Sequence, residues 1–182
     1  HEIKKDYILS SNPFFLYFAT TIPHGPTDEK RAWNADPLLS AIGYLDKAPD
    51  VLPSRKSIPE RLKKEGFPVD DSRCNLLWLD DVLGSLINTL EEENILDNTL
   101  IFFFSDHGQR AKGTLYQGGV HDPSIVWKAD GLPVGESSEA LVSGIDFTPT
   151  ILDIAGIEFD KEKFDGESFL PILLGKEVKE RT

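Results

Sequence analysis

Residues 99–123 read TLIFFFSDHGQRAKGTLYQGGVHDP. The five residues 100–104 are all apolar, without the alternation of a half-exposed strand. This pattern is typical of a strand covered on both faces in a parallel sheet. In open α/β sheets the functional groups gather just beyond the carboxyl ends of the strands. Asp106, His107 and Lys112 follow the strand directly, so the stretch predicts a central strand that ends in a functional site.

The rest of the chain alternates between strand and helix patterns. In order, we expect a buried strand at 13–19, a surface excursion at 25–70 with a short helix at 57–65, a helix from residue 71, strands at 100–104 and 124–127, and a helix at 148–155 closed by Gly156. This order predicts an α/β fold with a mainly parallel central sheet flanked by helices. His24 follows the first expected strand, so it is expected at the same sheet edge.

The composition of the chain bears on its partners, its disulfide bonds and its relation to membranes. The formal net charge of −12 over 182 residues disfavours a nucleic-acid partner. Cys74 is the single cysteine, so no intrachain disulfide can form. No apolar run approaches the roughly 20 residues of a transmembrane helix, and the first residues lack the pattern of a signal peptide. The chain begins at His1 without a Met, and we expect it to belong to a longer protein.

The candidate site residues have ordinary alternatives when each is taken alone. Asp106 and His107 place a carboxylate beside an imidazole, which could hold a metal ion, or they could be a capping Asp and a loop His. Lys112 could be a solvated lysine, although the nearby Gly113, Gly118 and Gly119 favour a loop with close backbone approach. His24, in a Pro-His-Gly-Pro sequence, is by itself an ordinary loop histidine.

Five ordered motifs carry a family resemblance. The segments at 13–17, 23–26, 98–108, 112–120 and 146–150 resemble the sulfatase family of the alkaline-phosphatase superfamily, in content and in order. The resemblance covers most of residues 11–175 and includes 164–168, which is similar to the family's late Asp-Gly-x-Ser-Leu segment. It implies an alkaline-phosphatase-like fold that lacks its N-terminal part in this chain.

The resemblance implies a hydrolase of sulfate esters with a divalent cation and a formylglycine nucleophile. The cation is usually Ca²⁺, with Mg²⁺ or Mn²⁺ as alternatives. Asp106 and His107 match the family's second pair of metal ligands, while Lys112 and His24 match catalytic residues that also bind the sulfate oxygens. His121 stands where many members carry Arg, which makes it a candidate substrate-binding residue. The implied substrate is a sulfated small molecule or a sulfated glycan, and the implied compartment is extracellular, periplasmic or lysosomal.

Two family features have no match in these residues. The family's first Asp-Asp pair and its Cys-x-Pro-Ser-Arg segment both precede the strand that leads to His24, and neither is present. Residues 51–55, Val-Leu-Pro-Ser-Arg, imitate the tail of that segment, but the first position is Val and the order is wrong. Cys74 lacks a following Pro-Ser-Arg. We therefore expect residues 1–182 to be a partial catalytic domain, inactive when isolated, with 11–157 as α/β core elements and 158–182 as the start of a C-terminal segment.

Three hypotheses follow from these observations. The first is a sulfatase of which this chain is the C-terminal portion of the catalytic domain. The second is a hydrolase of phosphate monoesters or diesters, since the metal pair is shared across the superfamily. The third is a non-catalytic fragment or pseudoenzyme that serves as a binding module.

Overall fold

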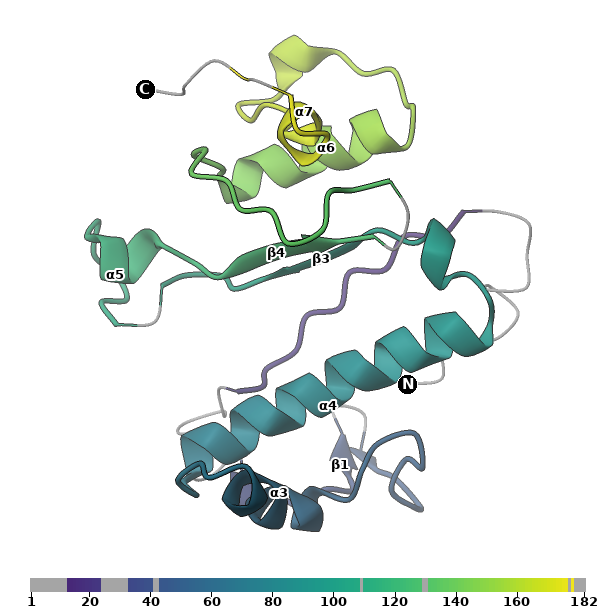
Figure 1. Cartoon of the computed structure of the whole chain (residues 1–182), viewed down its shortest axis with the longest axis vertical. Helices are drawn as coiled ribbons and strands as arrows, with labels where there is room; N and C mark the ends of the chain where they lie inside the picture. The colour runs from purple at the N-terminus through teal and green to yellow at the C-terminus, as the bar shows by residue number, and fades with distance from the viewer. Residues whose placement is uncertain are drawn as a thin grey trace. The chain divides into compact units, whose positions relative to one another are not determined.

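The computed structural model describes residues 13–23, 33–40, 43–108, 110–128, 131–176 and 178 (Figure 1). Its contacts divide the chain into two compact units, residues 1–95 and 96–182, and each is described by itself. His24 lies outside the described residues, so its predicted place beside the sheet stays a prediction.

The first unit is built on the long helix α4, which spans Asp71–Glu92. It begins where the sequence predicts, because Asp70 caps it: the Asp70 side chain accepts a hydrogen bond from the Arg73 backbone N–H at 2.8 Å. The predicted helix from residue 71 is thus confirmed. The second unit begins with a short 3₁₀ turn, η2, Leu96–Asn98.

Helix α3, Ile58–Lys64, packs on α4 and is preceded by the 3₁₀ turn η1, Arg55–Ser57. It confirms the short helix expected at 57–65. Ile58 is fully buried and forms a small core with Leu62 and Cys74. Two hydrogen bonds of 2.7 Å join the Arg61 guanidinium to the Asp81 carboxylate and tie the two helices together. The predicted surface excursion therefore supplies part of a core.

The predicted buried strand at 13–19 is wrong. The segment has no regular secondary structure, and its aromatic side chains are exposed, with Phe15 at 71% and Tyr17 at 73%. A strand needs a hydrogen-bonding partner, and among the described residues none pairs with this segment. The described ladder in this unit is a small antiparallel pair of β1, Leu39–Ser40, and β2, Gly43–Tyr44. An apolar run indicates burial in a strand only where a neighbouring strand is available.

The second unit contains β3, Ile101–Phe104, and β4, Ser124–Trp127, paired antiparallel with Ile101 opposite Trp127. Both strands confirm the sequence prediction, but a mainly parallel sheet is not shown, since each described sheet has two antiparallel strands. A parallel return needs a crossover, usually through a helix. The described part of the link between the strands holds one helix, the four-residue α5, Gln117–Val120, and the chain returns directly beside β3.

Helix α6, Phe147–Ile154, confirms the helix expected at 148–155, and Gly156 follows it with φ +66°. The remaining elements are the 3₁₀ turns η3, Gly144–Asp146, and η4, Lys161–Lys163, and the short helix α7, Leu170–Leu173. Phe147 lies with its ring centroid 4.3 Å from Phe104, 5.5 Å from Phe102 and 5.3 Å from Phe169. These rings fasten α6 and α7 to β3.

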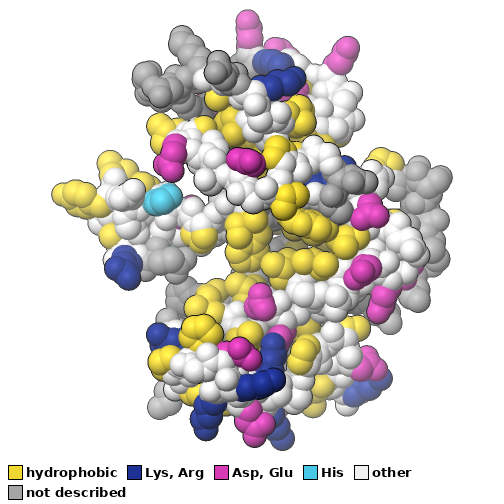
Figure 2. Space-filling view, in the orientation of Figure 1, with side chains coloured by type: hydrophobic (Ala, Val, Ile, Leu, Met, Phe, Trp, Pro, Cys, Tyr) yellow, Lys and Arg dark blue, Asp and Glu magenta, His cyan; other side chains and the backbone are white. Residues whose placement is uncertain are grey.

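Hydrophobic side chains remain on the surface of the second unit. Figure 2 shows hydrophobic side chains on the visible surface, and within β3 and β4 Ile125 is 59% exposed and Phe104 and Trp127 are each 39% exposed. The uninterrupted apolar sequence of β3 predicted a strand that is covered on both faces. In this structure β3 is not covered in that way. Within the described ranges, no helix has the length and apolar character to cross a membrane.

Candidate functional site

The loop between β3 and β4 is closed by its own backbone. The Gly108 N–H donates to the Gly119 carbonyl at 2.9 Å, and the Arg110 N–H donates to the Gly118 carbonyl at 3.0 Å. A Cβ on Gly108 would lie 2.5 Å from the Gly118 oxygen, and one on Gly119 would lie 2.5 Å from the Ala111 oxygen. Only glycine allows this contact. Of the glycines predicted to allow close backbone approach, Gly119 does so, whereas a Cβ on Gly113 would meet no atom within 4 Å and one on Gly118 would make only ordinary contacts; Gly108 is an additional close approach.

Asp106 and His107 lie side by side at the carboxyl end of β3. Their Oδ1 and Nε2 atoms are 3.5 Å apart, with the Asp106 side chain 83% exposed and the His107 side chain 29% exposed. Nδ1 of His107 lies 2.8 Å from the carbonyl oxygen of Gly108. A carbonyl oxygen can only accept, so Nδ1 is the donor of this contact, and in that tautomer Nε2 has a lone pair. Nε2 and the carboxylate together offer two ligand atoms to a cation.

The Asp106–His107 pair supplies two ligands and no more. In the part of the chain that the structure describes, no group of three or more His, Cys, Asp or Glu side chains is arranged to hold a metal ion. Further ligands would have to come from outside these described residues.

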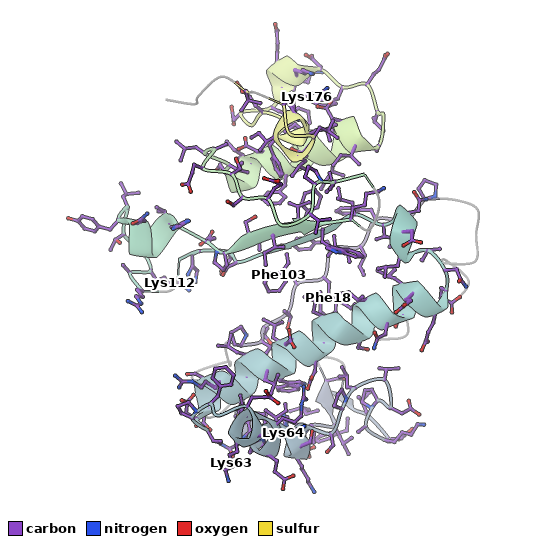
Figure 3. The ribbon with its side chains drawn as sticks, viewed as in Figure 1. Phe18, Lys63, Lys64, Phe103, Lys112 and Lys176 are labelled. Carbon is purple, nitrogen blue, oxygen red and sulfur yellow. The ribbon has the colours of Figure 1, made fainter. Side chains whose placement is uncertain are left out.

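Lys112 is exposed on a tight turn of the same loop. The Thr114 N–H and hydroxyl both donate to the Ala111 carbonyl, at 3.0 and 2.8 Å, and Gly113 has φ +82°. Figure 3 shows Lys112 on this loop, beyond the end of the β3–β4 sheet. No ion pair with Lys112 occurs among the described residues. Its ammonium group is therefore available to an external anion.

His121 follows α5, and its N–H donates to the Gln117 carbonyl at 2.8 Å. Its side chain lines a surface hollow together with Arg110, Gln117 and Gly118. Sequence reasoning named His121 but missed Arg110. The available signal was a second basic residue two positions before Lys112 in a glycine-rich loop.

The motif at 146–150 has a different character from the loop. Asp146 is 2% exposed, and its two carboxylate oxygens accept hydrogen bonds from the Ser143 N–H at 2.7 Å and the Glu167 N–H at 2.9 Å. The Thr150 hydroxyl donates to the Asp146 carbonyl at 2.6 Å and accepts from the Phe169 N–H at 3.0 Å. These bonds join two segments of the matched motifs to each other. Asp146 and Thr150 therefore organise the fold of this unit.

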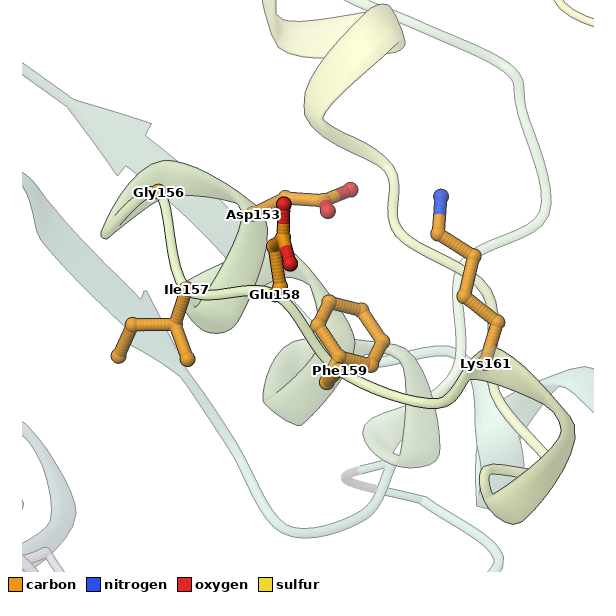
Figure 4. A pocket seen from close by; sticks show the side chains of 6 residues that line it. All are labelled: Asp153, Gly156, Ile157, Glu158, Phe159 and Lys161. Carbon is orange, nitrogen blue, oxygen red and sulfur yellow. The ribbon is translucent and has the colours of Figure 1, made fainter.

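A second surface hollow lies at the end of α6 (Figure 4). It is lined by Asp153, Gly156, Ile157, Glu158, Phe159 and Lys161. Figure 4 shows the carboxylates of Asp153 and Glu158 near each other and the Lys161 ammonium on the other side. The sequence analysis did not name this hollow, and it shares no residue with the β3–β4 loop.

Cys74 is 2% exposed in the core of the first unit. Burial raises the pKa of its thiol, and the nearby Asp71 and Asp70 raise it further. A buried thiol with a raised pKa is a poor nucleophile. This agrees with the sequence-based expectation that Cys74 does not replace the family's nucleophilic position.

The glycine-closed loop places Asp106, His107 and Lys112 beyond the end of β3, and comparison with known proteins assigns the class of the chain. The family model described as Sulfatase matches residues 5–157, and the chain belongs to the sulfatase family.

Among its relatives, N-acetylglucosamine-6-sulfatase of Bos taurus is 32% identical over 195 residues, an alignment that covers 93% of this chain and 33% of the relative. The chain thus spans about a third of the length of this curated relative. A solved structure of BT4656 in complex with its substrate D-glucosamine-2-N,6-O-disulfate is 30% identical with a TM-score of 0.56, covering 61% of this chain and 24% of the other.

A second solved structure, Ps i-CgsB in complex with k-i-k-neocarrahexaose, is 23% identical with a TM-score of 0.67, covering 94% of this chain and 36% of the other. At this identity the likeness concerns the fold alone. The sulfatase fold implied by the sequence motifs is supported by these neighbours, while the parallel arrangement of its central sheet is not shown by the strands described in this chain.

Proposed function

We propose that this chain contributes one part of the active site of a sulfuric ester hydrolase. The observation that carries the proposal is the glycine-closed loop after β3, which holds the Asp106–His107 pair and presents the exposed ammonium of Lys112 on one rigid segment. The proposal is supported by family membership and by the sulfatase names of the relatives.

The ligand chemistry of Asp106 and His107 fits one side of a divalent-cation site. A carboxylate oxygen suits a hard cation such as Ca²⁺, and the imidazole nitrogen also suits Mn²⁺ or other transition metals. Mg²⁺ would rely more on the carboxylate and on water. When bound, such a cation would withdraw electron density from a sulfate oxygen. The hydrogen bond from Nδ1 of His107 to Gly108 orients the ring for this role.

Lys112 would stabilise the negative charge that spreads over the sulfuryl oxygens when the ester S–O bond breaks. A fixed cation aimed at developing charge lowers the barrier without rearrangement during the reaction. His24, the second predicted catalytic residue, would donate to the same oxygens, and His121 would contact the substrate. The proposal also includes a formylglycine nucleophile. Cys74 is not proposed for this role, because it is buried within α4.

The proposed substrate class is a sulfated saccharide. The bovine relative is named for N-acetylglucosamine 6-sulfate, and BT4656 is described with a doubly sulfated glucosamine as its substrate. We extend this class to the present chain, in either free or glycan-bound form. An extracellular, periplasmic or lysosomal location belongs to the same proposal.

The test uses the full-length protein that contains these residues, matured in a host that makes formylglycine. Turnover is measured on a sulfated saccharide and on the matching phosphate ester, with Ca²⁺ present and after chelation. We expect hydrolysis of the sulfate ester that falls on chelation. Turnover of the phosphate ester alone would replace the sulfatase proposal with a phosphoesterase, and a folded protein inert toward both would favour a binding module.

A further inference from the structure

The hollow beside Lys112 has the features of an anion-binding subsite. Arg110, Gln117, Gly118 and His121 line it, and they come from both ends of the glycine-closed loop. Three of these four residues have side chains that carry nitrogen donors: a guanidinium, an amide and an imidazole. Asp122 follows His121 in the chain but does not line the hollow. The lining residues that the structure describes thus include no carboxylate that would repel an anion.

Arg110 is the principal cation of this hollow. It is the only arginine in the described part of residues 96–182, a unit in which the described basic residues are otherwise lysines and histidines. Among the described residues no carboxylate pairs with it. A guanidinium presents parallel N–H groups that match the oxygens of a sulfate or carboxylate in a bidentate arrangement. An arginine that pairs with no described carboxylate is suited to an external anion.

The backbone holds Arg110 in place. Its N–H donates to the Gly118 carbonyl at 3.0 Å, and Gly118 is itself part of the lining. The neighbouring Ala111 N–H donates to the same oxygen at 3.2 Å. The backbone of Arg110 is therefore hydrogen-bonded to the backbone of Gly118, another residue that lines the hollow. Preorganisation of this kind reduces the entropy lost when a ligand binds.

The hollow and Lys112 can serve one ligand. Arg110 and Lys112 are separated by a single residue, so their Cα atoms are at most about 7 Å apart. A sugar whose reacting sulfate lies at Lys112 would then bring a neighbouring substituent within reach of the Arg110 side chain.

We propose that Arg110, assisted by Gln117 and His121, binds a second anionic group of the substrate, either a sulfate or a carboxylate, and so selects saccharides that carry at least two such groups. This inference rests on the proposed sulfatase function and deepens it. Arg110 is a specificity-determining residue in this account, while Lys112 serves the reacting sulfate.

The experiment compares the full-length enzyme with its Arg110→Ala and Arg110→Lys variants on three saccharides. One carries a single sulfate, one carries two sulfates, and one carries a sulfate and a uronic carboxylate. The measured quantity is the ratio of kcat/KM for each doubly anionic saccharide to kcat/KM for the singly sulfated one, at constant ionic strength. The two doubly anionic substrates distinguish a sulfate from a carboxylate as the second group.

We expect Arg110→Ala to lower this ratio by about tenfold or more for the preferred doubly anionic saccharide, which is typical for loss of a hydrogen bond to a charged group. The change should appear mainly in KM, because the second group is bound equally in the ground and transition states. Arg110→Lys should lower the ratio less, since lysine keeps the positive charge and lacks only the bidentate N–H groups of the guanidinium. Lys176→Ala, which removes an exposed cation elsewhere in the unit, is the control.

A ratio unchanged in Arg110→Ala would overturn the inference, and so would an equal loss on all three saccharides. Thermal unfolding of each variant separates a binding effect from misfolding, and Arg110→Lys remains informative if the alanine variant does not fold. If the wild-type enzyme hydrolyses sulfate esters but the ratio does not move, this inference alone fails. If the wild type hydrolyses no sulfate ester, the proposed function fails and this inference fails with it.

Discussion

The β3–β4 loop and the Asp146–Thr150 segment both match motifs of the sulfatase family, yet they differ in physical character. In the loop, backbone hydrogen bonds from Gly108 to Gly119 and from Arg110 to Gly118 provide the rigidity, and the side chains of Asp106 and Lys112 are left exposed. In the second segment the side chains provide the rigidity, because Asp146 and Thr150 are buried and bonded to backbone groups.

The contrast shows how motifs of one family can be separated into two kinds. A polar side chain that is exposed on a rigid backbone has its hydrogen-bonding capacity available to a ligand. A polar side chain that is buried must satisfy that capacity within the fold. Substitutions in the loop should therefore act on catalysis or binding, and substitutions in the Asp146–Thr150 segment should act on stability.

Lys112→Ala should have the largest effect, and it should be catalytic. Loss of one preorganised group that stabilises developing negative charge typically lowers kcat by about 10²–10³-fold, or about 2.7–4 kcal/mol. The free energy of unfolding should change by no more than about 0.5 kcal/mol, because Lys112 is an exposed surface residue. Steady-state kinetics and urea unfolding of the full-length protein measure the two quantities. An unaltered kcat/KM would mean that Lys112 is only a surface lysine.

Asp146→Ala should come next, and it should act on stability. The substitution leaves the backbone N–H groups of Ser143 and Glu167 without their carboxylate acceptor. A hydrogen bond to a charged group contributes about 1.5–3 kcal/mol, and both bonds are partly buried, so we expect a loss of about 2–4 kcal/mol in the free energy of unfolding. Denaturant unfolding measures it, with the more exposed Asp153→Ala on α6 as the control. A loss no larger than that of the control would contradict the assignment of Asp146 to the fold.

Gly119→Ala should affect both stability and activity, because the added Cβ would clash with the backbone that closes the loop. The new Cβ would lie 2.5 Å from the carbonyl oxygens of Ala111 and Thr114. Overpacking of this kind costs about 1–3 kcal/mol, and the displaced loop should lower kcat/KM. The matched variant Gly84→Ala, in α4 with no atom within 4 Å of its Cβ, should instead gain about 0.5–1 kcal/mol. Equal effects of the two substitutions would show that the glycine closure is dispensable.

The smallest expected effect concerns Cys74, which is buried but belongs to neither region. Because burial raises the pKa of its thiol, the folded protein holds the thiol proton more tightly than the unfolded chain does. The resulting stability is fully present below the unfolded pKa of about 8.5 and is lost as pH rises through the higher folded pKa. Unfolding free energies measured across this alkaline range should decline less steeply in Cys74→Ser than in the wild type. If the unfolding free energies of the two proteins declined in parallel with pH, the Cys74 thiol would make no such contribution to stability.

The sequence predicted the local elements well because their signals are local. Leucines at steps of three and four predict α4, and Gly156 predicts the end of α6. Asp70, Asp71 and Ser72 were all candidates for the cap of α4, and the structure has Asp70 in that place. The pairing of strands was not predicted, since an apolar run such as residues 101–104 indicates a buried strand without specifying the direction of its neighbour. The same reason explains the wrong expectation at 13–19, where the described structure supplies no neighbouring strand.

The site was predicted in part for a similar reason. Asp106 and His107 are adjacent in sequence, so their proximity follows from the chain itself, and their contact is confirmed. The bond from Glu167 to Asp146 joins residues 21 positions apart, and no periodicity or spacing indicates such a partner. Arg110 was missed because a second basic residue close to Lys112 is a weak signal until the hollow that it lines is visible.

Thermal unfolding of the full-length protein over a Ca²⁺ titration, compared with its Asp106→Ala variant, tests most directly the claim that the loop presents ligand-binding groups. A cation that binds the folded state at a hundred times its Kd stabilises it by about 2.7 kcal/mol. We predict that Ca²⁺ raises the Tm of the wild type and of the control Asp97→Ala, which removes an exposed carboxylate in η2, and raises that of Asp106→Ala much less. An equal Ca²⁺-dependent rise in all three proteins would contradict the assignment of Asp106 to a cation site.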